Sequence, residues 1–188
     1  MGLELCGYLK FSKFLNIKKQ TLVIPKRVNQ IKIDIGLSFA APISSFWLDN
    51  LPDRIVYGFE PNPENVREIL SGENRKRGRN YRYVNLRYLN KRFFVFNSAI
   101  DNSDQSYKTF YMTEGDPGTS SLHMPRRFKI KKIIQVPCIK LSDFLSLIPW
   151  DRFPYIEHIK VDAQGNDLRI LKSAGKYLAD RIVYVTAE

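Results

Sequence analysis

Three acidic residues stand where a protein can bind a ligand or accept a proton. Asp34, Glu60 and Asp162 each lie at the end of a short run rich in isoleucine and valine, which is the pattern of a buried parallel strand. Ligands of open α/β sheets bind at the carboxyl ends of such strands. Right-handed βαβ connections bring these ends to one edge of the sheet, so the three acids are expected to converge on one crevice.

Glu60 and Gly36 indicate which ligand the crevice holds. A carboxylate after the second strand can accept hydrogen bonds from both hydroxyls of a ribose. A dinucleotide site would also need three glycines after the first strand, so that the pyrophosphate can approach a helix N-terminus. Only Gly36 is present, because residues 37–41 contain no glycine. The sequence therefore favours a ligand without phosphates.

Asp162 is the first candidate for a general base or for a group that orients a bound ligand. The alternative reading is a carboxylate that only caps the helix beginning near Gly165. His123 is a second candidate base, although a lone histidine in a loop is more often an exposed bystander, and His158 is expected to be structural. No cluster of histidine, cysteine or carboxylate residues has metal-ligand spacing, so no metal is predicted.

The elements that must position these residues predict an α/β fold with a Rossmann-like, doubly wound, mainly parallel sheet. An N-terminal cap segment is expected at 1–30 and the domain at 31–188. Parallel strands are expected at 31–35, 55–60, 93–96, 156–161 and 182–185, and helices at 43–51, 63–70, 165–174 and from 141 to before Pro149. Segments 107–113 and 133–139 predict an inserted antiparallel hairpin over the top of the sheet.

Two of the helices carry clear local signals. The second should begin with Asn62 as its N-cap and Pro63 at its first position, and should end at Gly72. The first should bury one apolar face, made of Ile43, Phe46, Trp47 and Leu51.

The composition places limits on the class of protein. A chain of 188 residues is most economically one domain, and its two cysteines, Cys6 and Cys138, lie far apart and predict inert thiols in a reducing compartment. No apolar run is long enough to span a membrane and the N-terminus lacks a signal-peptide core, so a cytoplasmic protein is expected.

The formal charge of +11 is concentrated in two stretches, 75–92 and 126–132, which also contain aromatic residues. Such stretches attract polyanions, nucleic acid among them. A solvated basic face that only keeps the protein soluble is an equally good reading.

The ordered motifs resemble the class I S-adenosylmethionine-dependent methyltransferases and, within them, the FkbM family. The resemblance covers residues from about 31 to 188. It rests on Ile33-Asp34-Ile35-Gly36, Phe59-Glu60-Pro61-Asn62-Pro63, Asn97-Ser98-Ala99-Ile100, Gly118-Thr119-Ser120-Ser121 and Ile159-Lys160-Val161-Asp162-Ala163-Gln164-Gly165.

The resemblance implies S-adenosylmethionine as cofactor and the strand order 3-2-1-4-5. It implies that Glu60 holds the ribose hydroxyls and that Asp162 lies beside the transferable methyl group. The full set of cofactor-binding positions it implies is Asp34, Gly36, Ser38, Glu60, Asn62, Ser98, Ala99, Ile100 and Asp162. Ser120, Ser121 and Gln164 would contact the substrate. The chain departs from the family where a further glycine is usual, at Ser38 and Ala40, and where an acid is frequent, at Gln164.

The first hypothesis for the function is an O-methyltransferase acting on a glycan or a small hydroxylated metabolite. The second keeps the fold and assigns a nucleic acid, such as RNA, as substrate; it ranks lower because no Asn-Pro-Pro-Tyr-like motif follows the fourth strand. The third is a catalytically silent fold that serves as a binding module. Members of the family continue beyond the fifth strand into an antiparallel hairpin, so a domain truncated after that strand and a homodimer through its edge are expected.

Overall fold

The computed structural model describes residues 15–16, 20–73 and 80–188. The predictions for Cys6, for most of the cap segment before residue 20 and for the basic residues within 75–79 lie outside these ranges. Within the cap, β1 (Leu15–Asn16) and β2 (Thr21–Leu22) form a small antiparallel pair.

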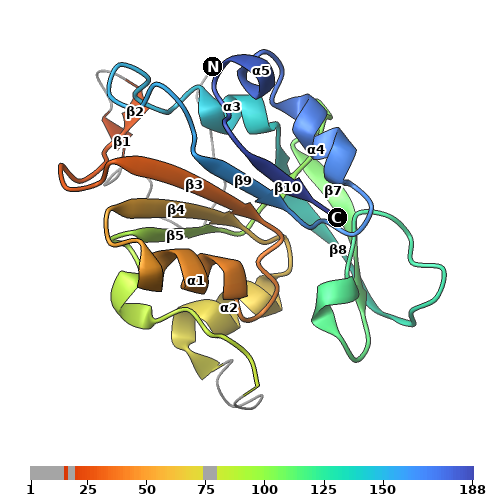
Figure 1. Ribbon diagram of the computed structural model, residues 1–188. Coiled ribbons are helices and arrows are strands. Elements are labelled where there is room, and N and C mark those ends of the chain that lie inside the picture. Colours follow the sequence, from red (N-terminus) through yellow and green to blue (C-terminus); the bar gives the residue numbers. More distant parts are fainter. Residues whose placement is uncertain (1–14, 17–19, 74–79) are drawn as a thin grey trace.

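A parallel five-stranded sheet forms the centre of the molecule (Figure 1). Its order is β10-β9-β3-β4-β5, and every neighbouring pair is parallel. Counted along the chain, this is the predicted order 3-2-1-4-5. The strands are β3 (Gln30–Ile35), β4 (Arg54–Phe59), β5 (Phe93–Phe96), β9 (His158–Val161) and β10 (Val185–Ala187).

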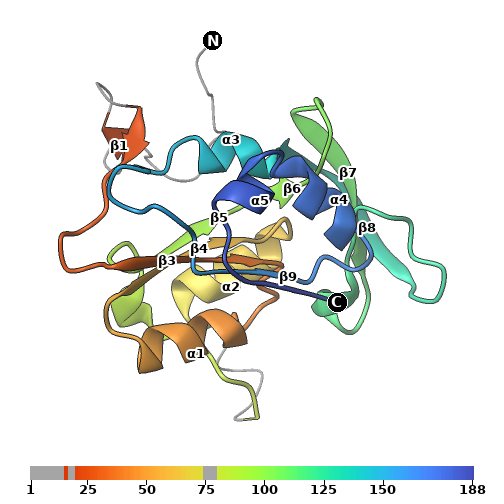
Figure 2. The same ribbon diagram turned by 45° about the horizontal axis from the view of Figure 1, so that its top comes forward.

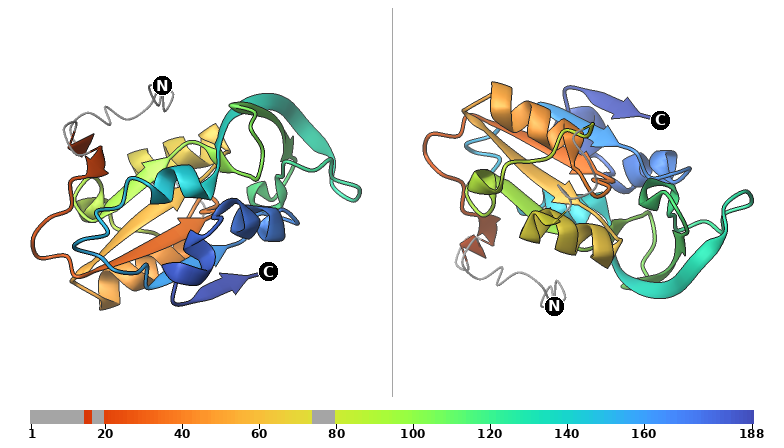
Figure 3. Two further views of the ribbon diagram at one scale, coloured as in Figure 1. Left: turned by 90° about the horizontal axis from the view of Figure 1, so that it is seen from above. Right: turned by 90° about the horizontal axis from the view of Figure 1, so that it is seen from below.

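Helices cover both faces of this sheet, as Figures 2 and 3 show. One face carries α1 (Pro42–Asn50) and α2 (Pro63–Ser71), and the other carries α3 (Leu141–Leu145), α4 (Asp167–Ser173) and α5 (Tyr177–Asp180). The arrangement confirms the doubly wound fold. It also explains why most residues of the central strands are apolar, since both of their faces are buried.

An aromatic cluster fills the core beneath α3. Tyr57, Phe59, Phe96 and Phe144 contact one another with ring centroids 4.9 to 6.3 Å apart. Each fully buried aromatic side chain contributes about 2–3 kcal/mol through its removal from water. On the opposite face, Trp47 and Leu48 of α1 pack with residues of α2 and β5 in a second cluster.

The inserted segment forms a second, smaller sheet. Strands β7 (Tyr107–Thr113) and β8 (Ile130–Ile139) pair antiparallel, which confirms the predicted hairpin, although β8 begins three residues earlier than expected. A third strand, β6 (Ala99–Ile100), pairs parallel to β8 and was predicted only as a turn. Because β6 follows β5 directly, it connects the inserted sheet to the carboxyl end of the central one.

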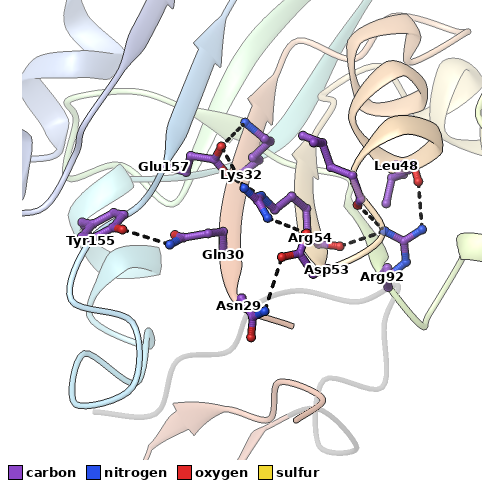
Figure 4. A network of polar contacts seen from close by, with 10 residues as sticks. Asn29, Gln30, Lys32, Leu48, Asp53, Arg54, Arg92, Tyr155 and Glu157 are labelled. Carbon is purple, nitrogen blue, oxygen red and sulfur yellow. Dashed lines mark hydrogen bonds and ion pairs between the residues drawn. The ribbon is translucent and has the colours of Figure 1, made fainter. Parts of the chain in front are cut away.

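The amino end of the central sheet is held by a network of charged side chains (Figure 4). Glu157 lies between Lys32 and Arg54: its Oε1 is 3.3 Å from Lys32 Nζ, and its Oε2 accepts a hydrogen bond of 2.7 Å from Arg54 Nε. The guanidinium of Arg92 donates to the carbonyl oxygens of Leu48, Leu51 and Arg54. The network thereby connects β3 and β4 to the residues that directly precede β9 and β5.

The predicted apolar face of α1 is only partly confirmed: Trp47 is buried and Leu51 packs against the same cluster, as expected, but the other two residues are not buried. Ile43 and Phe46 are exposed, whereas Ser44 and Ser45 are fully buried with Trp47 and Leu48. The serine hydroxyls are needed inside: Ser44 Oγ donates to Asp34 and Ser45 Oγ to the carbonyl of Tyr83. Hydrophobic periodicity cannot identify a helix face that is buried through hydrogen bonds.

The C-terminal elements are also shifted from their predicted bounds. β10 lies at 185–187 instead of 182–185, although Ile182 forms an isolated parallel bridge to Ile156. The helix predicted at 165–174 begins at Asp167, and α5, after Gly175, was not predicted. β10 forms one edge of the sheet, and the homodimer through this edge stays a prediction that light scattering at high concentration would test.

No helix within the described residues is long and apolar enough to cross a membrane.

Candidate active site

A cavity of about 370 Å³ opens at the carboxyl ends of β3, β4 and β9. This volume is typical of sites for small molecules. The central sheet supplies one side of its lining and the loop between β7 and β8 supplies the other. From the central sheet and its loops come Gly36, Ser38, Glu60, Ser98, Asp162 and Gln164, and from β6 of the smaller sheet come Ala99 and Ile100.

The turn at Gly36 brings two strand ends into direct contact. Gly36 has φ +81°, and a Cβ atom there would lie 1.8 Å from the carbonyl oxygen of Asp162. The Gly36 N–H donates to Phe59 O and the Asp162 N–H donates to Ile35 O. Only glycine can therefore occupy this position, because any side chain would push the end of β9 away.

The loop after Gly36 has left-handed backbone at two residues that carry side chains. Ser38 has φ 53° and Ala41 has φ 49°. The Ser38 N–H points at Glu60 and donates to its Oε2 at 2.8 Å. Non-glycine residues in this conformation cost about 1–2 kcal/mol each, and such strain is concentrated at functional sites.

Glu60 presents a buried carboxyl group to the cavity. It is 4% exposed, and its Oε1 accepts a hydrogen bond of 2.9 Å from the Asn62 N–H. Burial raises the pKa of Glu60 to about 7, although the two backbone N–H groups and Lys160 partly oppose this shift. Each carboxyl oxygen keeps further acceptor capacity beyond one N–H. Glu60 can therefore accept hydrogen bonds from the hydroxyl groups of a ligand.

Asp162 is half-exposed, with 42% of its side chain accessible, and lies on the cavity wall. Gln164 Nε2 donates to its Oδ1 at 3.1 Å, and Lys160 Nζ lies 3.6 Å from its Oδ2. The alternative reading, a helix cap, is wrong: Asp167 accepts hydrogen bonds from the N–H groups of Ala163 and Gly165 instead. The Glu188 carboxyl also hydrogen-bonds to Asp162, which raises the pKa of Glu188. The remaining acceptor positions of the half-exposed Asp162 carboxylate are available to a ligand.

A loop rich in hydroxyl groups forms the opposite wall. It includes η4 (Pro117–Thr119) and the two serines that follow, and Ser120 and Ser121 both line the cavity. Ser121 Oγ donates to the carbonyl of Gln164 at 3.1 Å. This bond joins the inserted sheet to the turn after β9.

The family model described as "Methyltransferase FkbM domain" matches residues 38–188. The chain belongs to this family. The assignment confirms the resemblance found in the sequence and makes the protein a methyltransferase. Neither a curated protein nor a solved structure matches the chain.

Three predicted site residues of this methyltransferase lie outside the cavity lining. The Asp34 carboxylate is buried and accepts hydrogen bonds from the N–H and hydroxyl of Ser44. Asn62 caps α2 with its side chain and contributes only its N–H, to Glu60. His123 is exposed, with its ring beside Gly165. These three side chains therefore lie outside the cavity lining, and their predicted roles in cofactor binding or as a base stay predictions.

Sequence reasoning missed other residues of the methyltransferase site. Phe39, Tyr81 and Phe110 line the cavity, and the rings of Phe39 and Tyr81 meet edge to face at 4.9 Å. Lys160 contacts the carboxyl ends of both β3 and β9. The strand register could have identified Lys160, because it pairs with Asp34 across the two parallel strands.

The basic stretches are less free than the sequence indicated. In the described part of 75–92, Arg92 is buried and Arg82 pairs with Asp49. In 126–132, Lys129 pairs with Glu114 and Lys131 with Glu64. Among the residues described here, the structure contains no group of three or more histidine, cysteine or acidic residues that could hold a metal.

Proposed function

We propose that this chain is an S-adenosylmethionine-dependent O-methyltransferase whose acceptor is a glycan or a small hydroxylated molecule in the cytoplasm. The observation that supports this most is one cavity that combines the buried carboxyl of Glu60, the half-exposed carboxylate of Asp162 and the hydroxyl-rich loop containing Ser120 and Ser121.

The residues present fit the proposed cofactor. The Glu60 carboxyl lines the cavity and keeps acceptor capacity for the two ribose hydroxyls. Gly36 leaves the backbone without a Cβ at the adjoining turn, and Ser98, Ala99 and Ile100 provide a buried, largely apolar wall for the base. When bound, the cofactor would supply an electrophilic methyl group on a sulfonium sulfur.

Asp162 would accept the proton of the acceptor hydroxyl at one of its carboxylate oxygens. Gln164 and Lys160 both contact this carboxylate and limit its rotation. A positioned base of this kind contributes about 100- to 10,000-fold to the rate of proton transfer. Alignment of the acceptor oxygen would come from the cavity walls.

The character of the cavity favours a hydroxylated acceptor over a nucleic acid. Thr119 and Ser120 line the cavity, and both share hydrogen bonds with the buried hydroxyl of Thr113 behind them, at 2.6 and 3.2 Å. Sugar hydroxyls can exchange hydrogen bonds with such groups. The described basic residues that are buried or paired give less support to a phosphate backbone as the partner.

The test has two stages. Calorimetric titration of the protein with S-adenosylhomocysteine should show one site per chain, and an absence of binding to folded protein would remove the cofactor proposal. Methyl transfer from labelled cofactor should then be measured with panels of glycans, small hydroxylated molecules and RNA. Transfer to RNA alone would overturn the proposed acceptor class.

A pair of variants isolates the base. Asp162→Asn should lower kcat about 100-fold or more while changing the affinity for S-adenosylhomocysteine little. Asp151→Asn, an exposed residue before β9, is the matched control and should leave both values unchanged. Equal turnover in the two variants would exclude Asp162 as the base.

A further inference from the structure

We infer that Lys160 is the positioning residue of the site: its charge fixes the Gly36 turn and the Asp162 carboxylate relative to each other. The inference rests on the proposed function, because it assigns this role with respect to the cofactor and acceptor sides of the same cavity.

Lys160 contacts three groups that belong to two strand ends. Its Nζ donates to the carbonyl oxygen of Gly36 at 2.6 Å, and it lies 3.3 Å from Asp34 Oδ1 and 3.6 Å from Asp162 Oδ2. Asp34 lies near the end of β3 and Gly36 directly follows that strand, whereas Asp162 follows β9. A single ammonium group therefore links the cofactor side of the cavity to the proposed base.

The surroundings of Lys160 explain why a cation is needed there. Its side chain is 15% exposed, and the Asp34 side chain beside it is 1% exposed. Among the described residues, Asp34 Oδ1 has no hydrogen-bond partner of good geometry, so the ammonium charge at 3.3 Å is what compensates it. A buried carboxylate without such compensation is costly.

Lys160 also acts on Glu60 through space. Its charge lowers the pKa of Glu60, which burial has raised to about 7. The other groups that face the Glu60 carboxyl are the N–H groups of Ser38 and Asn62 and the side chain of Asn65, and these are uncharged. A loss of the Lys160 charge should therefore raise the pH at which Glu60 ionises.

Lys160 does not line the cavity, so its effect is exerted through the groups it holds. A displacement of about 1 Å at reacting groups can reduce a rate about 100-fold. Removal of Lys160 should accordingly lower kcat more than it raises KM for the acceptor.

The experiment compares Lys160→Met and Lys160→Gln, which remove the charge, with Lys160→Arg, which keeps it. Lys91→Met is the matched control, because Lys91 is exposed and precedes β5 at the opposite end of the sheet. For each variant that unfolds cooperatively on heating, kcat, KM and the affinity for S-adenosylhomocysteine are measured between pH 6 and pH 8.5.

We expect both neutral variants to lose 10- to 100-fold in kcat, and the pH at which cofactor affinity rises to move upward. Lys160→Arg should recover at least part of kcat and keep the wild-type pH profile. If Lys160→Met does not fold, Lys160→Gln, which can still donate to the Gly36 carbonyl, provides the same comparison.

Wild-type kcat and pH profile in a folded neutral variant would overturn the inference while leaving the proposed function intact. By contrast, wild-type protein that binds no S-adenosylhomocysteine would remove the proposed function first, and the inference with it.

Discussion

The two ends of the central sheet use charged residues in opposite ways. At the amino end, one carboxylate, Glu157, lies between the cations of Lys32 and Arg54. At the carboxyl end, one cation, Lys160, contacts the carboxylates of Asp34 and Asp162. Its charge also lowers the pKa of a third, Glu60, without contact. At the amino end the ion pairs are balanced, with Lys32 and Arg54 against Glu157 and Asp53. The carboxyl end has an excess of acids.

The pKa shifts follow this difference. Burial alone would raise the pKa of Glu157, but the hydrogen bond from Arg54 and the nearby Lys32 outweigh it and hold the pKa below its ordinary value. At the cavity, burial dominates and raises the pKa of Glu60. The amino end is therefore arranged for stability, whereas the carboxyl end keeps acceptor atoms for a ligand.

Backbone strain is distributed in the same way. Ser38, Ala41 and Gln164 are non-glycine residues with positive φ, and all three lie in the turns beside the cavity. Strain of this kind persists only where the surrounding structure holds it in place. The carboxyl end thus contains both the excess of acids and much of the strained backbone.

The largest expected loss of stability comes from a substitution at Gly36, which lies directly against the backbone of Asp162. Gly36→Ala should destabilise the fold by more than about 4 kcal/mol, because its Cβ would overlap the Asp162 carbonyl oxygen. Gly115→Ala is a matched control with the same φ of +81° and no atom within 4 Å of its Cβ. It should cost only the backbone strain, about 1–2 kcal/mol. Urea unfolding measures the free energy of unfolding of both variants. Equal losses would show that the overlap with the Asp162 carbonyl oxygen adds nothing to the backbone strain.

The second effect is the pH dependence of Glu60. Its folded-state pKa of about 7 lies above the ordinary 4.5, so its contribution to stability is fully present below pH 4.5 and is lost as the pH rises through 7. The loss amounts to about 3 kcal/mol. Glu60→Gln should abolish this decline in urea unfolding, and should weaken S-adenosylhomocysteine binding about 10- to 100-fold at pH 8.

The matched variant at the amino end should show the opposite pH dependence. Glu157→Gln should cost about 1–2 kcal/mol at neutral pH, because Lys32 and Arg54 lose their common anion. Its folded-state pKa is lowered, so this stabilisation is present above pH 4.5 and disappears as the pH falls below it. Affinity for S-adenosylhomocysteine should not change. A variant that unfolded like the wild type but bound cofactor poorly would contradict the division between the two ends.

The fold was largely predictable because its signals are local. The β-branched runs, the Asn62-Pro63 start of α2 and its end at Gly72 all determine structure within a few residues, and the structure confirms them. The buried face of α1 was not predictable, because Ser44 is buried by a hydrogen bond to Asp34, ten residues away, and not by its hydrophobicity.

The site was predictable where a residue acts at the end of its own strand. Glu60 and Asp162 reach the cavity as expected, because the strand directs them there. Asp34 does not, because Ser44 and Lys160 hold its carboxylate from other elements. Tyr81 could not be foreseen, since it reaches the cavity from a loop whose path depends on contacts such as Val84 N–H to Ala40 O.

The smallest effect tests whether the strain beside the cavity is real. Ser38→Gly would relieve the left-handed backbone at φ 53° but would also add conformational freedom to the unfolded chain. These contributions oppose each other, so a net stabilisation of less than about 1 kcal/mol is expected. Asn90→Gly is the matched control, with φ 56° in a turn before β5 at the amino end. Asparagine tolerates this conformation, so its replacement should give no gain or a slight loss. Urea unfolding of the two variants measures the difference. A gain in the free energy of unfolding at position 38 that is absent at position 90 would show that the backbone at the carboxyl end is strained. Equal changes would mean that Ser38 is no more strained than an ordinary turn residue.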